Sequence, residues 1–290
     1  MGARVWTVRD ALEWTSGYLD EHGDPAPRRS AEWLICAATG LSRVEVYTLW
    51  DRPLSEDERA TLREGVRRRA EGEPLQHVTG EMPFRHLVVR VGPGVFIPRP
   101  ETETLVEAVL EAAGPSPVVV DLCTGSGCVA LALAQEAGAS VWATDIDRDA
   151  ALTARENAAR LGLAGRVTVL EGDLFAPLPP DLLGGVDAVV ANPPYVPTAD
   201  IAALPGEVAR FEPARALDGG EDGLDTARRI IAEASRWLRP GGVLAMELDE
   251  TRVDDAAIVM RAWYEGVQTR RDLTGRPRVV IGRATEANEL

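Results

Sequence analysis

The chain has 290 residues, of which 45% are hydrophobic and 27% charged, a composition typical of folded globular proteins. No apolar stretch approaches the roughly 20 residues that span a bilayer, and the acid-containing N-terminus lacks the apolar core of a signal peptide. The net charge is −15 and all 31 basic residues are arginine, so the surface would repel a partner held by its phosphate backbone.

Cysteine usage indicates a reducing compartment. Cys36, Cys123 and Cys128 form neither an even disulfide framework nor the spacing of a zinc site. We therefore expect a cytoplasmic protein without structural disulfides or a bound metal.

Residues 1–75 are predicted to form a small helical domain. A helical spacing of apolar residues begins at Thr7, and Pro27 and Gly40 are suited to open and close a second helix. The patterns Ser42-x-x-Glu45 and Ser55-x-x-Glu58 match the capping box that marks helix starts.

An arginine run, Arg67 to Arg69, closes the fourth predicted helix. A nucleic-acid patch is one interpretation of such a run. Because Glu64, Glu71 and Glu73 surround it, a solvated helix face is the favoured interpretation.

Residues 76–100 are predicted to link the two domains. The stretch HLVVRV alternates apolar and polar positions and is bracketed by glycine and proline, a pattern typical of a β-hairpin.

Residues 101–290 alternate strand and helix patterns. A helix at residues 103–113 precedes five apolar strand patterns, PVVVDL, SVWATD, RVTVLEGD, VDAVVANPP and GGVLAMEL, most of them separated by helical stretches. This order predicts an α/β fold with a doubly wound, mostly parallel sheet, whose ligands bind at the carboxyl ends of the strands.

A glycine-rich loop, Asp121-Leu-Cys-Thr-Gly-Ser-Gly127, joins the first of these strands to a helix. Its glycines allow close backbone approach to a ligand, and the helix start presents free N–H groups. Asp145 lies 20 residues after Gly125 at the next strand end, where a carboxylate can accept both hydroxyls of a ribose. A ribose-containing cofactor is predicted, without a choice between NAD and S-adenosylmethionine. The candidate residues of the loop are Asp121, Cys123, Thr124, Gly125, Ser126 and Gly127.

The sequence EGDLF follows the third strand. Asp173 is suited to accept a hydrogen bond from an adenine amino group, and Leu174 or Phe175 to pack against the ring. The signal is weak because aspartate at a strand end is usually a turn residue.

Asn192-Pro193-Pro194-Tyr195 follows the fourth strand. The two prolines end any regular structure, and Pro193 holds Asn192 in an extended conformation. The Asn192 side-chain oxygen and the Pro193 carbonyl can accept both N–H groups of a planar amide or amine, while Tyr195 bounds the slot. Such a site accelerates attack by alignment and needs no strong general base.

At this place in the fold, the tetrapeptide resembles that of methyltransferases that alkylate a planar nitrogen, which favours S-adenosylmethionine over NAD. The stretches at residues 73–103, 143–162, 211–248 and 270–283, with those around the glycine loop and the tetrapeptide, resemble the HemK/PrmC family. That family methylates the side-chain amide of the glutamine in the Gly-Gly-Gln motif of class I peptide-chain release factors.

The resemblance implies a class I S-adenosylmethionine-dependent methyltransferase (Rossmann-like) sheet with a helical N-terminal domain, residues 1–75, that grips the release factor. It implies that residues 121–127 and Asp145 bind S-adenosylmethionine with Asn192 close by, and that Asp173 and Leu174 line the adenine pocket. The glutamine amide is assigned to Asn192, Pro193, Pro194 and Tyr195, with Phe96 and Arg99 folding over the active site.

The chain departs from the family at Cys123, where glycine is usual, and at Leu174, where some members have tryptophan. One alternative is a nucleic-acid methyltransferase acting on adenine N6 or guanine N2, which would need a basic, aromatic-rich domain to hold a flipped base. We find no such insertion and expect no direct nucleic-acid binding. A glutamine methyltransferase with another protein substrate and a silent cofactor-binding scaffold are the remaining alternatives.

Overall fold

The computed structural model describes residues 5–285, which divide into two compact units. The first comprises the chain up to Glu81 together with the segment Pro205–Phe211; the second comprises Met82–Leu204 and the chain from Glu212 onward. The boundary between the units therefore lies between Glu81 and Met82. The sequence analysis instead predicted a helical domain that ends at residue 75 and a linker that ends at residue 100. The segment Pro205–Phe211, distant in the sequence, also belongs to the helical unit.

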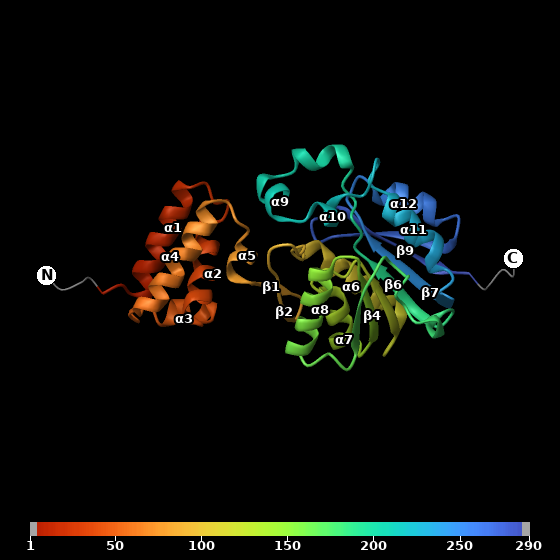
Figure 1. The fold of residues 1–290 in the computed structure, drawn as a ribbon, viewed down its shortest axis with the longest axis horizontal. Helices are drawn as coiled ribbons and strands as arrows, with labels where there is room; N and C mark the ends of the chain where they lie inside the picture. Colours follow the sequence, from red (N-terminus) through yellow and green to blue (C-terminus); the bar gives the residue numbers. More distant parts are fainter. Residues whose placement is uncertain (1–4, 286–290) are drawn as a thin grey trace. The chain divides into compact units, whose positions relative to one another are not determined.

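Among the described residues, the helical unit has six helices, and the first five pack around one apolar core (Figure 1). The six are α1 (Val8–Glu21), α2 (Pro27–Thr39), α3 (Arg43–Thr48), α4 (Glu56–Ala70), α5 (Leu75–Thr79) and α9 (Gly206–Phe211). The predicted starts are confirmed, because Ser42 and Ser55 each form a full capping box and Gly40 closes α2 in a left-handed conformation.

The arginines at the end of α4 differ in burial: Arg67 is exposed, whereas Arg69 is buried. Arg67 pairs with Glu64 at 2.6 Å on an exposed face, as predicted. The solvated-face interpretation is wrong for Arg69, whose side chain is only 7% exposed and contacts Asp24 at 2.6 Å and Glu207 at 3.0 Å. These carboxylates come from distant parts of the chain, so helical spacing alone could not identify them.

The second unit is built on a seven-stranded sheet with the strand order β5-β4-β3-β6-β7-β9-β8. Its strands are β3 (Val118–Leu122), β4 (Ser140–Asp145), β5 (Val167–Glu171), β6 (Val186–Ala191), β7 (Leu238–Glu247), β8 (Tyr264–Arg271) and β9 (Pro277–Ala284). Pairing is parallel from β5 to β7 and antiparallel at β9 and β8. A separate hairpin, β1 (Glu81–Phe84) and β2 (Leu87–Arg90), precedes the sheet.

Helices cover both faces of this sheet because successive strand residues point to opposite sides. In β3, Val119 belongs to one apolar cluster and Val120 to the other. The helices α6 (Glu103–Ala113), α7 (Cys128–Glu136) and α8 (Arg148–Arg160) pack on the first face, and α11 (Asp225–Ala234) and α12 (Val253–Met260) pack on the second (Figure 1).

The strand order reverses at β3, which pairs with β4 on one side and β6 on the other. In open parallel sheets a crevice forms at this switch point, outside the carboxyl ends of the strands. The loops after β3, β4, β5 and β6 all leave the sheet at this edge. Between residues 5 and 285, no helix is both long and apolar enough to cross a membrane.

Candidate functional site

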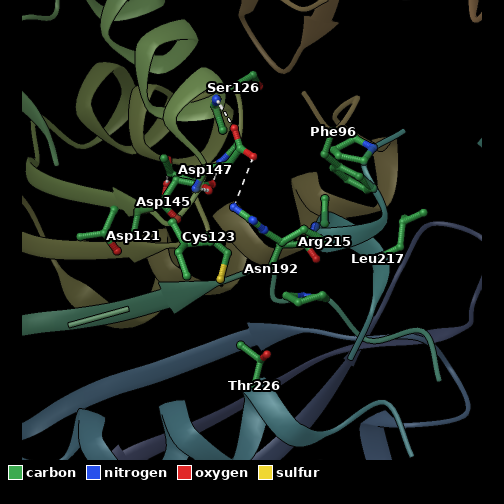
Figure 2. Close-up of a pocket in the computed structure, with 18 of the residues that line it drawn as sticks. Phe96, Asp121, Cys123, Ser126, Asp145, Asp147, Asn192, Arg215, Leu217 and Thr226 are labelled. Atoms are coloured by element: carbon green, nitrogen blue, oxygen red, sulfur yellow. Dashed lines mark hydrogen bonds and ion pairs between the residues drawn. The ribbon is translucent and has the colours of Figure 1, made fainter. Parts of the chain in front are cut away.

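A cavity of about 250 Å³ opens at the carboxyl ends of the central strands (Figure 2). Most of the residues predicted from the sequence line it. They are Phe96, Asp121, Cys123, Thr124, Gly125, Ser126, Asp145, Asp173, Leu174, Asn192, Pro194 and Tyr195. Arg99, Gly127 and Pro193 do not line it, so any contribution they make comes from behind the cavity wall or through the backbone.

The glycine-rich loop follows β3 and wraps the start of α7. Gly125 has a φ of 56° and its N–H donates to the Asp145 carboxylate at 2.9 Å. Gly127 has a different role: its φ is 82°, and an added Cβ would lie 3.1 Å from the Cβ of Ala154 on α8. Gly127 therefore permits helix packing rather than ligand contact.

Two non-glycine residues of the cavity wall have left-handed backbones, Cys123 with a φ of 57° and Leu174 with a φ of 48°. Side-chain sterics make this conformation costly, and it persists where the surrounding structure holds it. Both are positions where the sequence departs from the family pattern. The strained turns bring the loops after β3 and β5 to the cavity despite the missing glycine at 123.

Asp145, the last residue of β4, organises the loops around it. Its two carboxylate oxygens accept the N–H of Gly125 and of Asp147, each at 2.9 Å. Burial raises the pKa of Asp145 above its usual value. Each oxygen of an ionised carboxylate has a second lone pair, so Asp145 can still accept hydroxyl groups from a ligand in the cavity.

Asp121 braces the glycine-rich loop from inside. Its side chain is buried and accepts from the hydroxyl of Thr124 at 2.5 Å and from the N–H of Ala130 at 3.2 Å. Burial raises the pKa of the Asp121 carboxyl to about 7. The carboxyl thus ties the loop to the first turn of α7.

We expect Asp121 to lower the stability of the unliganded protein as the pH rises towards neutrality. The folded protein keeps this proton up to about pH 7, whereas the unfolded chain releases it at about pH 4. The native state therefore binds more protons between these values, and the free energy of unfolding falls by up to about 1.4 kcal/mol per pH unit. Urea unfolding across this range should show a steeper decline for wild type than for Asp121→Asn. Parallel curves would contradict the assignment.

Asp173, after β5, lies against an arginine that sequence reasoning missed. The Arg229 guanidinium on α11 contacts the Asp173 carboxylate at 2.6 Å, and both side chains line the cavity. The pair leaves Asp173 with free lone pairs for a ligand amino group and adds a positive charge beside them. Nothing in the sequence marked Arg229, since charged residues are ordinary on an amphipathic helix.

The Asn192-Pro-Pro-Tyr195 segment follows β6 and is held by a glycine-rich stretch further along the chain. A Cβ at Gly219 would lie 2.8 Å from the Pro194 carbonyl oxygen, and one at Gly223 would lie 2.3 Å from that of Tyr195. Only glycine allows this approach. Burial raises the pKa of the Tyr195 hydroxyl, which therefore stays protonated at neutral pH.

Asn192 presents its side chain at the cavity wall, opposite the loops after β3 and β4 (Figure 2). Its Nδ2 donates to the hydroxyl of Thr102 at 3.4 Å. Thr102 is buried and also lines the cavity, although the sequence analysis did not single it out. The contact leaves the Asn192 Oδ1 as the free acceptor of the amide.

Phe96 and Arg99 have different places in the site. The Phe96 ring lines the cavity, and the Arg99 guanidinium lies over that ring, 4.8 Å from its centroid. Arg99 also pairs with the buried carboxylate of Glu212. Arg99 thus fixes Phe96 through cation–π contact and an ion pair.

The cavity has a further wall from residues 213–218, which pattern reasoning did not identify. Arg215 reaches Asp147 across the cavity, with the guanidinium nitrogen 3.8 Å from the carboxylate oxygen (Figure 2). Both side chains line the cavity. The only signal in the sequence was their place in stretches that resemble the family.

The residues present fit S-adenosylmethionine. The cavity combines the carboxylates of Asp121 and Asp145, on the β3 and β4 side, with the apolar side chain of Leu174. Among the described residues, the buried hydroxyl of Thr144, which lines the cavity, has no hydrogen-bond partner. A ligand with several donors, such as a ribose with an amino acid group, would satisfy such acceptors.

Comparison with known proteins agrees with this geometry. Residues 10–80 match the PrmC N-terminal domain, and residues 119–212 match a methyltransferase domain. The chain is 43% identical over 281 residues to the release factor glutamine methyltransferase of Geobacter sulfurreducens, covering 96% of this chain and 97% of that protein. A relative of the same name in Mycolicibacterium smegmatis is 44% identical over 280 residues, with 94% and 96% covered.

A solved methyltransferase from Pyrococcus furiosus has the same fold in the second unit. It superposes with a TM-score of 0.52 at 18% identity, covering 69% of this chain and 89% of that one. The predicted fold class, a class I methyltransferase sheet with a helical N-terminal domain, is confirmed.

Proposed function

The chain belongs to the release factor glutamine methyltransferase family, and from this premise we propose how its site works. It is an S-adenosylmethionine-dependent methyltransferase. We propose that its substrate is the glutamine of the Gly-Gly-Gln motif in class I peptide-chain release factors, and that the methyl group is transferred to the side-chain amide nitrogen.

One observation carries this proposal: Asn192 and the loop that includes Asp145 line the same cavity from opposite sides. A nitrogen held at Asn192 and a methyl donor held at Asp145 would therefore meet inside one enclosure. Alignment at near-contact distance, about 3 to 3.5 Å between the reacting atoms, is a large part of the rate gain for such a transfer.

The chain's residues would act by orienting the amide. The Asn192 Oδ1 and the Pro193 carbonyl accept its two N–H groups, which turns the nitrogen lone pair towards the donor. Tyr195 limits the slot on one side and stays uncharged. S-adenosylmethionine, when bound, supplies an electrophilic methyl group on its sulfonium sulfur. The amide nitrogen would form a bond to the methyl carbon as the bond from that carbon to sulfur breaks, which leaves the sulfur as a neutral thioether. The nitrogen afterwards loses one proton to solvent, so no strong base is required.

Binding of the methyl donor is assigned to the loops after β3, β4 and β5. Asp145 accepts the ribose hydroxyls, and the loop of residues 123–126 contacts the amino acid part. Leu174 packs on the adenine, whose amino group donates to Asp173. The place of Asp145, Asp173 and Leu174 on the cavity wall supports these proposed roles.

The helical unit is proposed to recognise the body of the release factor, while the cavity takes its glutamine. This places the protein in the cytoplasm, where translation termination occurs, and requires no contact with nucleic acid. The acidic net charge of −15 supports a protein substrate over a polyanionic one.

The test is a methyl-transfer assay with labelled S-adenosylmethionine and purified release factor, beside a release factor with Gln→Ala in its Gly-Gly-Gln motif. Label that appears in the first and is absent from the second is the expected result. Label in neither protein would overturn the release factor as substrate. A parallel reaction with DNA and ribosomal RNA should stay unlabelled, and label there would favour nucleic-acid methylation.

A further inference from the structure

The orientation of the Asn192 amide decides whether the slot works. The oxygen and nitrogen of an asparagine side chain are nearly equal in size, so a half-turn exchanges an acceptor for a donor. With the nitrogen facing the cavity, two N–H groups would oppose each other and the substrate amide would be repelled. Because the two orientations have nearly the same shape, packing cannot select one of them. The selection must come from the hydrogen-bond partners of the amide.

Thr102 is the partner that the structure provides. It is the last residue of a short 3₁₀ helix, Pro100–Thr102, and is only 2% exposed. Its Oγ1 lies 3.4 Å from the Asn192 Nδ2. The distance is at the long end for a hydrogen bond, as is common in a site without its substrate.

A threonine hydroxyl can both donate and accept, so Thr102 alone would not fix the amide. Its hydroxyl also lies close to Glu247, the last residue of β7, which is 1% exposed, and hydrogen bonding from Thr102 lowers the pKa of that carboxyl. An ionised carboxylate only accepts. The Thr102 proton must therefore point to Glu247, which leaves an oxygen lone pair for the Asn192 Nδ2–H.

The surroundings of Glu247 determine when it is ionised. Its pKa is raised to about 7, chiefly by burial and also by Glu101, against the lowering effects of Thr102, Arg278 and Arg99. Tyr195 and the thiol of Cys128 also face this carboxyl and are uncharged at neutral pH, because burial raises both of their pKa values. As the pH rises through about 7, the Glu247 carboxyl therefore loses its proton. It can donate a hydrogen bond before this change and can only accept hydrogen bonds after it.

We propose that Thr102 and Glu247 are positioning residues that set the direction of the Asn192 amide, with its oxygen towards the substrate. The chain of hydrogen bonds runs from Asn192 through Thr102 to Glu247. It joins residues from three separate parts of the sequence, and neither Thr102 nor Glu247 needs to touch the reacting atoms. This inference rests on the proposed function for its catalytic consequence, but the hydrogen bonds themselves can be observed without any turnover.

The first readout is the side-chain amide spectrum of ¹⁵N-labelled protein. The sequence has only three asparagines and three glutamines, so the Asn192 signals can be assigned with Asn192→Ala. In wild type we expect these signals to shift as Glu247 titrates at about pH 7, and to be fixed over this range in Glu247→Gln. Thr102→Val should abolish the shift, and Thr102→Ser, which keeps the hydroxyl, should restore it.

The second readout is steady-state methylation of the release factor. Thr102→Val is expected to lower kcat about tenfold or more, because it removes a buried hydrogen bond and leaves the Asn192 amide without a fixed direction. The KM for the release factor and the Kd for S-adenosylmethionine should stay within about threefold of wild type. Thr15→Val is the matched control, since this buried threonine of α1 has a hydroxyl without a partner among the described residues.

The outcomes separate the two proposals. If the Asn192 signals of Thr102→Val still shift with pH as they do in wild type, the positioning role is overturned, whatever the rates are. A kcat loss that Thr102→Ser fails to restore would also overturn it. If the Asn192 signals behave as expected but wild type does not methylate the release factor, the amide orientation stands and the substrate assignment falls.

Discussion

Asn192→Ala is expected to lower kcat for release-factor methylation by about 10³-fold, with the Kd for S-adenosylmethionine changed little. The variant removes the side-chain oxygen that is assigned to accept the substrate amide N–H, so the amide nitrogen would lie in the slot without a fixed direction. Loss of a single aligned hydrogen bond at a reacting group costs about 10² to 10³ in rate, and misalignment adds to it.

The fold should tolerate this change, since Asn192 is not fully buried and its one side-chain hydrogen bond is the 3.4 Å contact to Thr102. Thermal unfolding of wild type and variant should therefore agree within a few degrees. Single-turnover rates with saturating S-adenosylmethionine measure the effect directly. A variant that transfers methyl groups at the wild-type rate would contradict the assigned role of Asn192.

The second large effect is expected for Asp145→Ala, which should raise the Kd for S-adenosylmethionine by about 10²-fold. The substitution removes an acceptor for the ribose and also frees the N–H groups of Gly125 and Asp147, which Asp145 holds at 2.9 Å. Hydrogen bonds to charged groups contribute about 1.5 to 3 kcal/mol each. Isothermal titration with S-adenosylmethionine gives the affinity without dependence on the protein substrate.

Asp187→Ala is the matched control for this experiment. Asp187 lies in β6 near the amino ends of the strands and accepts the N–H of Val118 at 2.7 Å. Its loss should lower stability as Asp145→Ala does, because each leaves a backbone N–H without its acceptor. Its effect on cofactor affinity should be small. Equal affinities in both variants would remove Asp145 from the ribose role.

The sequence was most informative where function depends on backbone geometry. The glycine-rich loop and the Asn192-Pro-Pro segment each follow an apolar strand, and parallel strands end at one edge of the sheet. Their meeting in one cavity could therefore be expected before any coordinates. The starts of helices could also be predicted from the sequence, because a capping box is a contact between residues three positions apart.

Contacts between distant residues could not be predicted in this way. Arg69 is buried because Glu207 and Asp24 reach it, and no local pattern records those encounters. Thr102 and Glu247 could not be predicted for the same reason. Thr102 ends a short 3₁₀ helix and Glu247 ends β7, and only the complete fold brings both near Asn192. The antiparallel pair β8 and β9 also went unassigned, because its strands alternate weakly and its partner order depends on the whole sheet.

The helical unit is not continuous in the sequence, since Pro205–Phe211 belongs to it. During synthesis the ribosome releases α1 to α5 long before α9, so the carboxylate of Glu207 reaches Arg69 only after β3 to β6 have been made. The N-terminal unit therefore completes its fold late, although it is translated first. Proteolytic cleavage within residues 205–211 would for the same reason weaken the N-terminal helical unit, although the cut lies far from it in the sequence.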